Sequence, residues 1–344
     1  MDPIDFFAIG DIATEPFIRL KDADVHCKIN NEECEICMRW GDKIPYESFT
    51  ICAAVGNSSN AAVAAARLGL HSALRAYLGK DRYGEDSLGV LKAEHVNTTY
   101  MVIDPTRPSN YHYVLWYGDN RIILVKHEEY DYTVPELASA PKWIYLSSLA
   151  ANSLPYHQAL IEWLKKYPES KLAFQPGTFQ IKLGVEALRP IYERSDLFIC
   201  NKEEAERILN KPAGSDMKEL LCAMQALGPK IVVITDGKHG CYAVDEAGLL
   251  ASPAQAGQTG KAIHVPHYPD PRPPFEITGA GDALASSTAA ALALGKPLNE
   301  ALCWGAANAA AVIQEIGAQK GLLTREQIEH AVAHPPAAWE IVSL

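Results

Sequence analysis

The sequence predicts an α/β fold with three layers (α/β/α), in which helices cover both faces of a mainly parallel β-sheet. Short apolar segments alternate with helical segments along most of the chain, an order typical of strands joined by crossover helices. Of the 344 residues, 48 % are hydrophobic and 21 % are charged. These fractions are ordinary for a globular protein, and a chain of this length can bury a large core. We therefore exclude a disordered or fibrous protein.

Apolar runs predict buried strands, because a strand that is covered on both faces is apolar throughout. The expected strands span residues 6–9, 143–146, 171–174, 197–200 and 230–235. Segments with apolar residues at helical spacing predict the helices between them. The expected helices span residues 60–70, 154–166, 202–209, 217–227, 281–294 and 298–316. The first and the last two of these helices are rich in Ala.

Two regions, residues 12–50 and 98–130, do not follow the alternation of strands and helices. In these regions polar residues alternate with apolar residues. Within the second region, residues 111–117 and 121–125 flank Gly118-Asp119-Asn120, which predicts a β-hairpin. We expect these regions to form a small antiparallel sheet outside the main one. Residues 251–274 are rich in Ala, Gly and Pro and are expected to be a loop.

The net charge and the sequence of apolar residues indicate which partners and which cellular location to expect. The net charge of −11 argues against a nucleic-acid partner, but backbone N–H groups can still hold a small anion. No apolar stretch reaches the roughly 18 residues of a membrane helix, and the first residues do not resemble a signal peptide. We expect a cytoplasmic protein with free thiols and no membrane contact.

The early cysteines, Cys27, Cys34, Cys37 and Cys52, include a Cys-x-x-Cys pair. A zinc site normally needs a second such pair, which the sequence lacks. Alternation around Glu35 and Met38 predicts a strand, which would place Cys34 and Cys37 on opposite faces. We therefore expect no metal there, and the role of these cysteines stays open.

The segment Glu276-Ile277-Thr278-Gly279-Ala280-Gly281-Asp282 precedes a long Ala-rich stretch and is the most informative part of the chain. Small residues let a ligand approach the backbone N–H groups at a helix start, where the helix dipole favours a phosphate. An Asp there would repel the phosphate, unless it accepts the proton of an attacking hydroxyl. The alternative is that Asp282 is only an N-cap.

Other nucleotide-binding patterns are missing. The chain has no Walker A sequence, which disfavours a P-loop kinase. No Gly-x-Gly-x-x-Gly follows Phe6–Ile9, which weakens a dinucleotide-binding interpretation.

Six short motifs, in order, resemble those of the ribokinase-like (PfkB) family of sugar and nucleoside kinases, and they span nearly the whole chain. The segment 276–282 is similar to the family's D-T-x-G-A-G-D signature. The other similar segments are Gly56–Gly69 (GNSSNAAVAAARLG), Gly79–Gly84, Asn201–Glu204, Thr235–Gly240 and Gly317-Ala318. The resemblance implies a ribokinase-like fold, with residues 1–344 as one kinase domain and a small β-sheet lid formed by residues 12–50 and 98–130.

The resemblance also implies roles for individual residues. Asp282 would be the catalytic base, and the N–H groups of Gly279, Ala280 and Gly281 would stabilise charge on the transferred phosphoryl group. Residues implied on the ATP side are Asn201, Thr235, Gly237, Gly240 and Asn308, with Glu204 organising Mg²⁺ through water. Residues implied on the acceptor side are Asp11, Glu15, Gly56, Asn57 and Asn60.

Several of these residues have simpler interpretations. Asn201 and Glu204 also fit a helix start, as a cap and its partner at N3. Asn60 fits an N-cap, Thr235 and Gly237 fit a turn at a strand end, and Asn308 fits an ordinary helix position.

The sequence departs from the family pattern at named positions. Glu276 stands where the family has an Asp that helps to bind a monovalent cation, so Glu276 is the candidate ligand for K⁺ and a K⁺ requirement is open. Ile277 replaces Thr, Gln175 replaces a carboxylate near the phosphates, and Glu15 replaces an Asp in the acceptor site.

These observations predict an ATP- and Mg²⁺-dependent kinase that phosphorylates a hydroxymethyl group of a small sugar. The alternatives are a nucleoside kinase of the adenosine type and a non-catalytic nucleotide-binding member of the fold. The aromatic residues Tyr111, Tyr113, Trp116 and Tyr117 are expected to stack on an acceptor, to fill the lid core or to contact a second subunit. A homodimer through the lid is expected.

Overall fold

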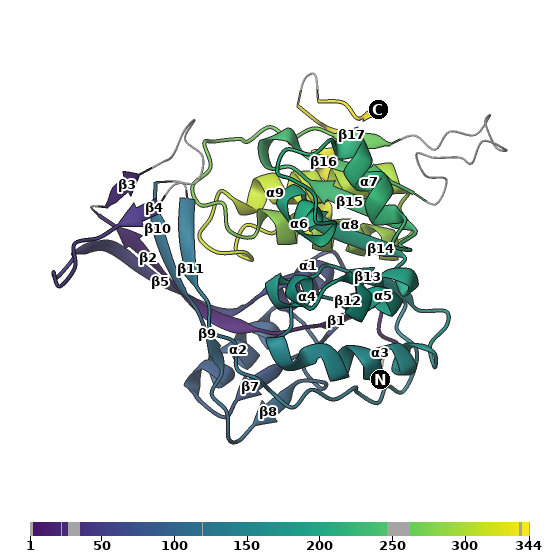
Figure 1. Cartoon of the computed structure of the whole chain (residues 1–344), viewed down its shortest axis with the longest axis horizontal. Coiled ribbons are helices and arrows are strands. Elements are labelled where there is room, and N and C mark those ends of the chain that lie inside the picture. The colour runs from purple at the N-terminus through teal and green to yellow at the C-terminus, as the bar shows by residue number, and fades with distance from the viewer. Residues whose placement is uncertain are drawn as a thin grey trace.

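The computed structural model describes residues 3–21, 23–26, 35–118, 120–245, 262–336 and 339–343. Its main element is a nine-stranded sheet with the order β18-β17-β16-β15-β14-β13-β12-β1-β6 (Figure 1). The parallel strands are β6 (Ser72–Arg75), β1 (Phe6–Ile9), β12 (Trp143–Leu146), β13 (Lys171–Phe174), β14 (Leu197–Asn201) and β15 (Ile231–Thr235). The antiparallel edge comprises β16 (Cys241–Val244), β17 (Ile263–Val265) and β18 (Val342–Ser343).

Helices cover both faces of the main sheet, as the continuous apolar strands predict. In β1, Phe6 and Ala8 belong to one core cluster, and Phe7 and Ile9 belong to the other. The first face is covered by α1 (Asn57–Arg67), α8 (Ala280–Ala293) and α9 (Leu298–Val312), with contributions from α2 (Arg82–Ala93) and α10 (Arg325–Ala333). The second face is covered by α3 (Leu154–Leu164), α5 (Val185–Arg194), α6 (Lys202–Ile208) and α7 (Met217–Gln225).

The expected three-layer α/β fold is therefore confirmed. Strands β1, β6 and β12 are buried on both faces along their whole length, so the free energy of burying apolar side chains stabilises the sheet from two sides. Within the described part of the chain, none of the helices is long and apolar enough to span a membrane.

Most of the expected helices begin or end one to four residues away from their expected bounds. The larger differences concern α1, α9 and the segment expected to be a loop. Helix α1 begins at Asn57, three residues before the expected start, because Gly56 is its N-cap. Helix α9 ends at Val312 rather than at residue 316. Strand β17 (Ile263–Val265) lies inside the segment expected to be a loop, where it pairs with β16. The earlier part of that segment lies outside the described residues.

A second sheet extends from one side of the molecule, at the left in Figure 1. Its order is β11-β10-β2-β5, and β9 (Asn110–Tyr111) also pairs with β2. The strands are β2 (Ala13–Leu20), β5 (Tyr46–Val55), β10 (Tyr113–Tyr117) and β11 (Asn120–Leu124). The expected hairpin is β10–β11. The expectation of a wholly antiparallel sheet is wrong, because β10 runs parallel to β2.

The remaining short elements belong to neither of these two sheets. Strands β3 (Asp24–His26) and β4 (Glu35–Cys37) pair with each other, as do β7 (Tyr77–Gly79) and β8 (Val102–Asp104). Strand β8 lies in the second region that we expected to form the small sheet, yet it is not part of that sheet. A short helix, α4 (Thr178–Leu183), follows β13. Strand β4 agrees with the expected strand around Glu35. Cys27 and Cys34 lie outside the described residues.

Asp81 fixes the turn that joins β7 to α2. Its carboxylate accepts hydrogen bonds from the Gly84 N–H and from both the N–H and the hydroxyl of Ser109. Asp81 is therefore the N-cap of α2 and also ties that helix to the segment after β8.

We expect Asp81→Ala to lower the free energy of unfolding by about 2–4 kcal/mol, because it removes a cap and leaves the Ser109 donors without their acceptor. The matched control is Asp216→Ala, which removes only the bond from the Glu219 N–H to the α7 cap and is expected to cost about 1 kcal/mol. Urea unfolding of both variants measures the difference. Equal losses would show that the contacts with Ser109 contribute nothing.

Candidate functional site

Two adjoining cavities lie beside the carboxyl ends of β13, β14 and β15. The first has a volume of about 320 Å³ and contacts the N-terminus of α8, and the second has a volume of about 410 Å³ and contacts the loop after β1. The residues that line both are Glu15, Gly56, Asn57, Arg121, Ile123 and Glu204. Polar residues after parallel strands gather at one edge of a sheet, which is where open α/β sheets bind ligands.

The first turn of α8 lines the first cavity. Gly279 is the N-cap and has a left-handed conformation (φ +87°), and a Cβ there would lie 2.5 Å from Ala318. A Cβ on Gly281 would meet nothing within 4 Å, so this part of the turn is open to a ligand. The first backbone N–H groups of a helix have no partner within the helix and attract anions. The turn therefore fits a phosphate group.

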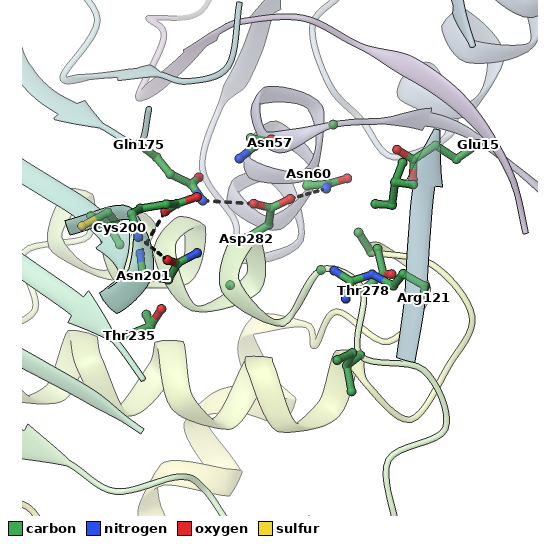
Figure 2. Close-up of a pocket in the computed structure, with 18 residues that line it drawn as sticks. Glu15, Asn57, Asn60, Arg121, Gln175, Cys200, Asn201, Thr235, Thr278 and Asp282 are labelled. Atoms are coloured by element: carbon green, nitrogen blue, oxygen red, sulfur yellow. Dashed lines mark hydrogen bonds between the residues drawn. The ribbon is translucent and has the colours of Figure 1, made fainter. Parts of the chain in front are cut away.

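Asp282 lies in this same turn, and it is not the N-cap, so the capping alternative is wrong. Its Oδ2 accepts a hydrogen bond from Asn60 Nδ2 at 2.8 Å, and its Oδ1 accepts one from Gln175 Nε2 at 3.0 Å (Figure 2). Burial raises the pKa of this carboxyl group, and the two hydrogen bonds oppose that rise. A carboxylate with a raised pKa at the edge of an anion-binding turn is suited to accept a proton.

Asn60 lies one helical turn inside α1, so the alternative that it caps this helix is also wrong. It lines the first cavity together with Gly56 and Asn57. Gly56 is the N-cap of α1 at φ +118°, and a Cβ there would lie 2.9 Å from the Asp11 carbonyl oxygen. Gly56 and Asn57 line both cavities, so the start of α1 lies where the two cavities meet.

Asn201 and Glu204 lie where β14 passes into α6, and they form the expected reciprocal cap. Asn201 Oδ1 accepts from the Glu204 N–H at 2.8 Å, and Glu204 Oε2 accepts from the Asn201 N–H at 2.9 Å. Burial raises the pKa of Glu204. These oxygen donors fit Mg²⁺, which usually takes one or two carboxylates and keeps several waters. Within the described ranges there is no group of three or more His, Cys, Asp or Glu residues that could form a full metal cage.

Glu276 is fully buried beneath the anion-binding turn. Its Oε1 accepts hydrogen bonds from the N–H and the hydroxyl of Thr278, and Arg121 Nε lies 3.9 Å from the same oxygen. Burial raises the pKa of Glu276. A guanidinium group from β11 therefore stands beside the carboxylate that was the candidate ligand for K⁺. This pairing does not fit a bound monovalent cation.

Asp11 and Glu15 line the second cavity, and each is paired with an imidazole. Asp11 Oδ2 lies 2.8 Å from His127 Nδ1, and Glu15 Oε1 lies 3.3 Å from His112 Nδ1. Tyr132 donates its hydroxyl to both oxygens of Asp11. The ring of Phe179 packs edge-on against His127 at 5.4 Å. This cavity offers both hydrogen-bonding groups and an apolar wall, which suits a polyol.

Thr235 lines the first cavity, but Gly237, Gly240 and Asn308 do not line either cavity in the described part of the chain. Asn308 is fully buried, where it donates to Ser287 Oγ at 2.6 Å and accepts from the Leu323 N–H at 2.8 Å. These bonds join α9 to α8 and to the segment before α10. A role for Gly237, Gly240 and Asn308 in binding ATP stays a prediction.

Sequence reasoning missed several residues that line the cavities. Arg121 and Ile123 come from β11, His112 lies between β9 and β10, and His127 follows β11. The one available signal was Arg121, a charged residue that opens an otherwise apolar strand. The aromatic residues of the hairpin do not line the cavities among the described residues. Trp116 is buried against Phe275, with the Arg19 guanidinium group 4.8 Å from its ring centre.

Comparisons with known proteins identify relatives over most of this chain. Ribokinase from Bacillus subtilis is 28 % identical over 283 residues, covering 81 % of this chain and 87 % of the relative. The 5-dehydro-2-deoxygluconokinase of the same organism is 25 % identical over 303 residues, covering 83 % of this chain and 89 % of the relative.

Solved structures show the same fold. Arabidopsis thaliana ribokinase, complexed with ribose and ATP, superposes with a TM-score of 0.73 at 18 % identity, covering 97 % of this chain and 100 % of that one. A nucleoside kinase from Methanocaldococcus jannaschii gives a TM-score of 0.71 at 17 % identity, covering 97 % and 99 %. The family model for pfkB carbohydrate kinases matches residues 47–325. The chain thus belongs to the PfkB family of carbohydrate kinases.

Proposed function

We propose that this protein transfers the γ-phosphoryl group of ATP to a hydroxymethyl group of a small sugar, with Asp282 as the catalytic base. The observation that carries the proposal is the position of Asp282, which lines the first cavity in the same helix turn as Gly279 and Gly281. One short segment thus combines a proton acceptor with an anion-binding site, which is what phosphoryl transfer to an alcohol requires.

In the proposed reaction, the acceptor hydroxyl gives its proton to Asp282 as its oxygen attacks the γ-phosphorus. The bond from that phosphorus to the β–γ bridging oxygen breaks, and ADP leaves. The N–H groups of Gly279 and Gly281, which line the first cavity, would stabilise charge on the transferred group. Ala280 is not among the described residues that line either cavity, and its N–H donates to the Ile277 carbonyl oxygen at 3.5 Å, so its expected part in this role is not supported. Asn201 and Glu204 would hold Mg²⁺ through water, which would neutralise phosphate charge.

The second cavity is proposed to hold the acceptor, between Glu15, Asn57 and the paired Asp11. A sugar is supported by its hydrogen-bonding residues and by the ribokinase and dehydrodeoxygluconokinase relatives. A nucleoside is the second candidate, because Ile123, Val125 and Phe179 provide an apolar wall for a base. We propose a cytoplasmic enzyme, with the whole chain as one kinase domain and the second sheet as its lid. A lid over the second cavity would exclude water and so limit hydrolysis of ATP.

The experiment that tests the function is a panel of sugars and nucleosides, incubated with Mg-ATP and coupled to detection of ADP. We expect at least one sugar to be phosphorylated. A protein that binds ATP and phosphorylates none of the panel would instead be a nucleotide-binding member of the fold without catalysis.

Asp282→Asn is expected to lower kcat by about 10²–10⁴-fold, because an amide cannot accept the proton. The amide is nearly isosteric, so ATP affinity measured by calorimetry serves as the control and should stay close to that of wild type. An unchanged kcat would show that Asp282 is not the base.

Activity is expected to be the same in K⁺, Na⁺ or choline chloride at equal ionic strength. The reason is that Arg121 already places a positive charge beside Glu276, and a second cation there would be repelled. Initial rates in the three salts provide the measurement. Strong activation by K⁺ alone would mean that a cation site exists despite Arg121.

We also propose that the protein forms a homodimer through the lid. The lid face opposite to Arg121 and Ile123 carries a row formed by Phe49, Ile18, Leu115 and Ile122, which are register partners on neighbouring strands. Adjacent positions on this face include Ile51, Tyr113 and Leu124, each about half exposed. An apolar sheet face of this kind is typical of an interaction surface.

The double variant Phe49→Asp/Leu124→Asp is expected to convert a dimer into a monomer in analytical ultracentrifugation, since it would bury charges in the apolar contact. Ile341→Asp, which changes an exposed apolar residue outside the lid, is the matched control and should stay dimeric. A monomeric wild type would refute the lid dimer.

A further inference from the structure

Two pairs of hydrogen-bonded side chains converge on Asp282, one pair on each oxygen of its carboxylate. We call Asn60 and Gln175, which donate directly to the carboxylate, the amide clamp (Figure 2). Behind them stand Gln319, which contacts Asn60, and Tyr145, which contacts Gln175. Each member of the clamp is thus held by one further side chain that does not touch Asp282.

The orientation of Asn60 follows from a backbone carbonyl. Gln319 Nε2 lies 2.6 Å from the Ala54 carbonyl oxygen, which can only accept, so the amide nitrogen of Gln319 must face that way. The same nitrogen lies 3.0 Å from Asn60, which must therefore present its Oδ1. Asn60 is then left with its Nδ2 toward Asp282. Asn60 and Gln319 are both buried, so water does not compete for these groups.

The orientation of Gln175 follows from Tyr145 in a similar way. Tyr145 lies on β12 and is fully buried, and its hydroxyl donates to Gln175 Oε1. Burial, together with the charge of Asp282, raises the pKa of Tyr145 well above its ordinary value, so the phenol keeps its proton. With its oxygen engaged by Tyr145, Gln175 presents its NH₂ group to the carboxylate.

We propose that the amide clamp orients Asp282 and sets its basicity, and that Tyr145 and Gln319 are positioning residues for the clamp. The inference rests on the proposed function, in which Asp282 is the base. It gives Gln175 a definite task at a position where the family pattern has a carboxylate. It also gives Asn60 a second role, because Asn60 would orient the base in addition to lining the acceptor side of the site.

Neutral donors suit this task better than a cation would. Each amide takes one acceptor direction of one carboxylate oxygen, and a carboxylate oxygen has a second direction for the acceptor hydroxyl. A cation in the same place would lower the pKa of Asp282 strongly and weaken it as a base. A second carboxylate there would repel the charge on Asp282 and raise its pKa further.

The test that needs no substrate is a ¹³C NMR titration of the Asp carboxyl groups in the full-length protein, with Asp282→Asn used to assign the signal. In Gln175→Met, the pKa of Asp282 is expected to rise by about one unit, because one hydrogen bond to the charged form is lost. Tyr145→Phe and Gln319→Leu should give smaller rises. Tyr192→Phe, at a buried phenol outside the clamp, is the matched control and should give none.

The kinetic arm uses the sugar or nucleoside that wild type phosphorylates fastest in the panel. In Tyr145→Phe we expect kcat to fall about tenfold with unchanged KM values, which corresponds to losing one well-placed hydrogen bond. The acid limb of kcat against pH should move to higher pH, because the raised pKa keeps Asp282 protonated over a wider range. Tyr192→Phe should change neither.

The two arms separate the two ideas. Unshifted pKa values in folded Gln175→Met and Tyr145→Phe would overturn the amide clamp, even if the wild-type protein is an active kinase. The other outcome is that the variants shift the pKa of Asp282 but the wild-type protein phosphorylates no acceptor. This result would support the effect of the clamp on the pKa of Asp282, and it would overturn the proposal that Asp282 acts as a catalytic base. Circular dichroism and thermal melting establish that each variant is folded.

Discussion

The parallel arrangement of the central strands is the constraint on which the site depends. Because β1, β12, β13, β14 and β15 run in the same direction, the residues that follow them meet at one edge of the sheet. Asp11, Gln175 and Asn201 come from three separate parts of the chain and reach the same pair of cavities for this reason. Burial on both faces then holds this edge rigid, so small side-chain networks can keep their geometry.

The acidic character of the chain does not conflict with binding of a polyphosphate. In the proposed function the phosphates contact backbone N–H groups at the start of α8, and this kind of anion binding does not depend on net charge. The acidic residues near these N–H groups each have different hydrogen-bonding or charged partners. Glu276 is paired with Arg121 and Thr278, Glu204 lies in a reciprocal helix cap, and Asp282 accepts two amide hydrogen bonds. Each carboxylate therefore has polar partners of its own, and these oppose the rise in pKa that its burial causes.

The fold could be predicted from the sequence, and so could the placement of Asp282 beside a Gly-rich helix start, because both signals are local. The apolar runs identified the parallel strands, and the segment 276–282 combined an anion-binding turn with Asp282 in a few residues. Long-range contacts could not be predicted in this way. Gln175 reaches Asp282 across 107 positions, and Arg121 reaches Glu276 from the second sheet. The parallel pairing of β10 with β2 also escaped prediction, because the alternation of a strand does not reveal its partner.

The amide clamp has a consequence for how this protein can diversify. The clamp and its two positioning residues come from α1, from β12, from the residue after β13 and from the segment after α9. Among the described contacts of these four residues, the second sheet contributes the Ala54 carbonyl, a backbone atom that any residue there supplies. The residues around the second cavity come largely from the second sheet and its connections. In the proposed function, substitutions there can reshape the acceptor pocket while Gln175, Tyr145 and Gln319 keep their contacts. Asn60, which the proposal places on both sides, is the residue that links recognition to chemistry.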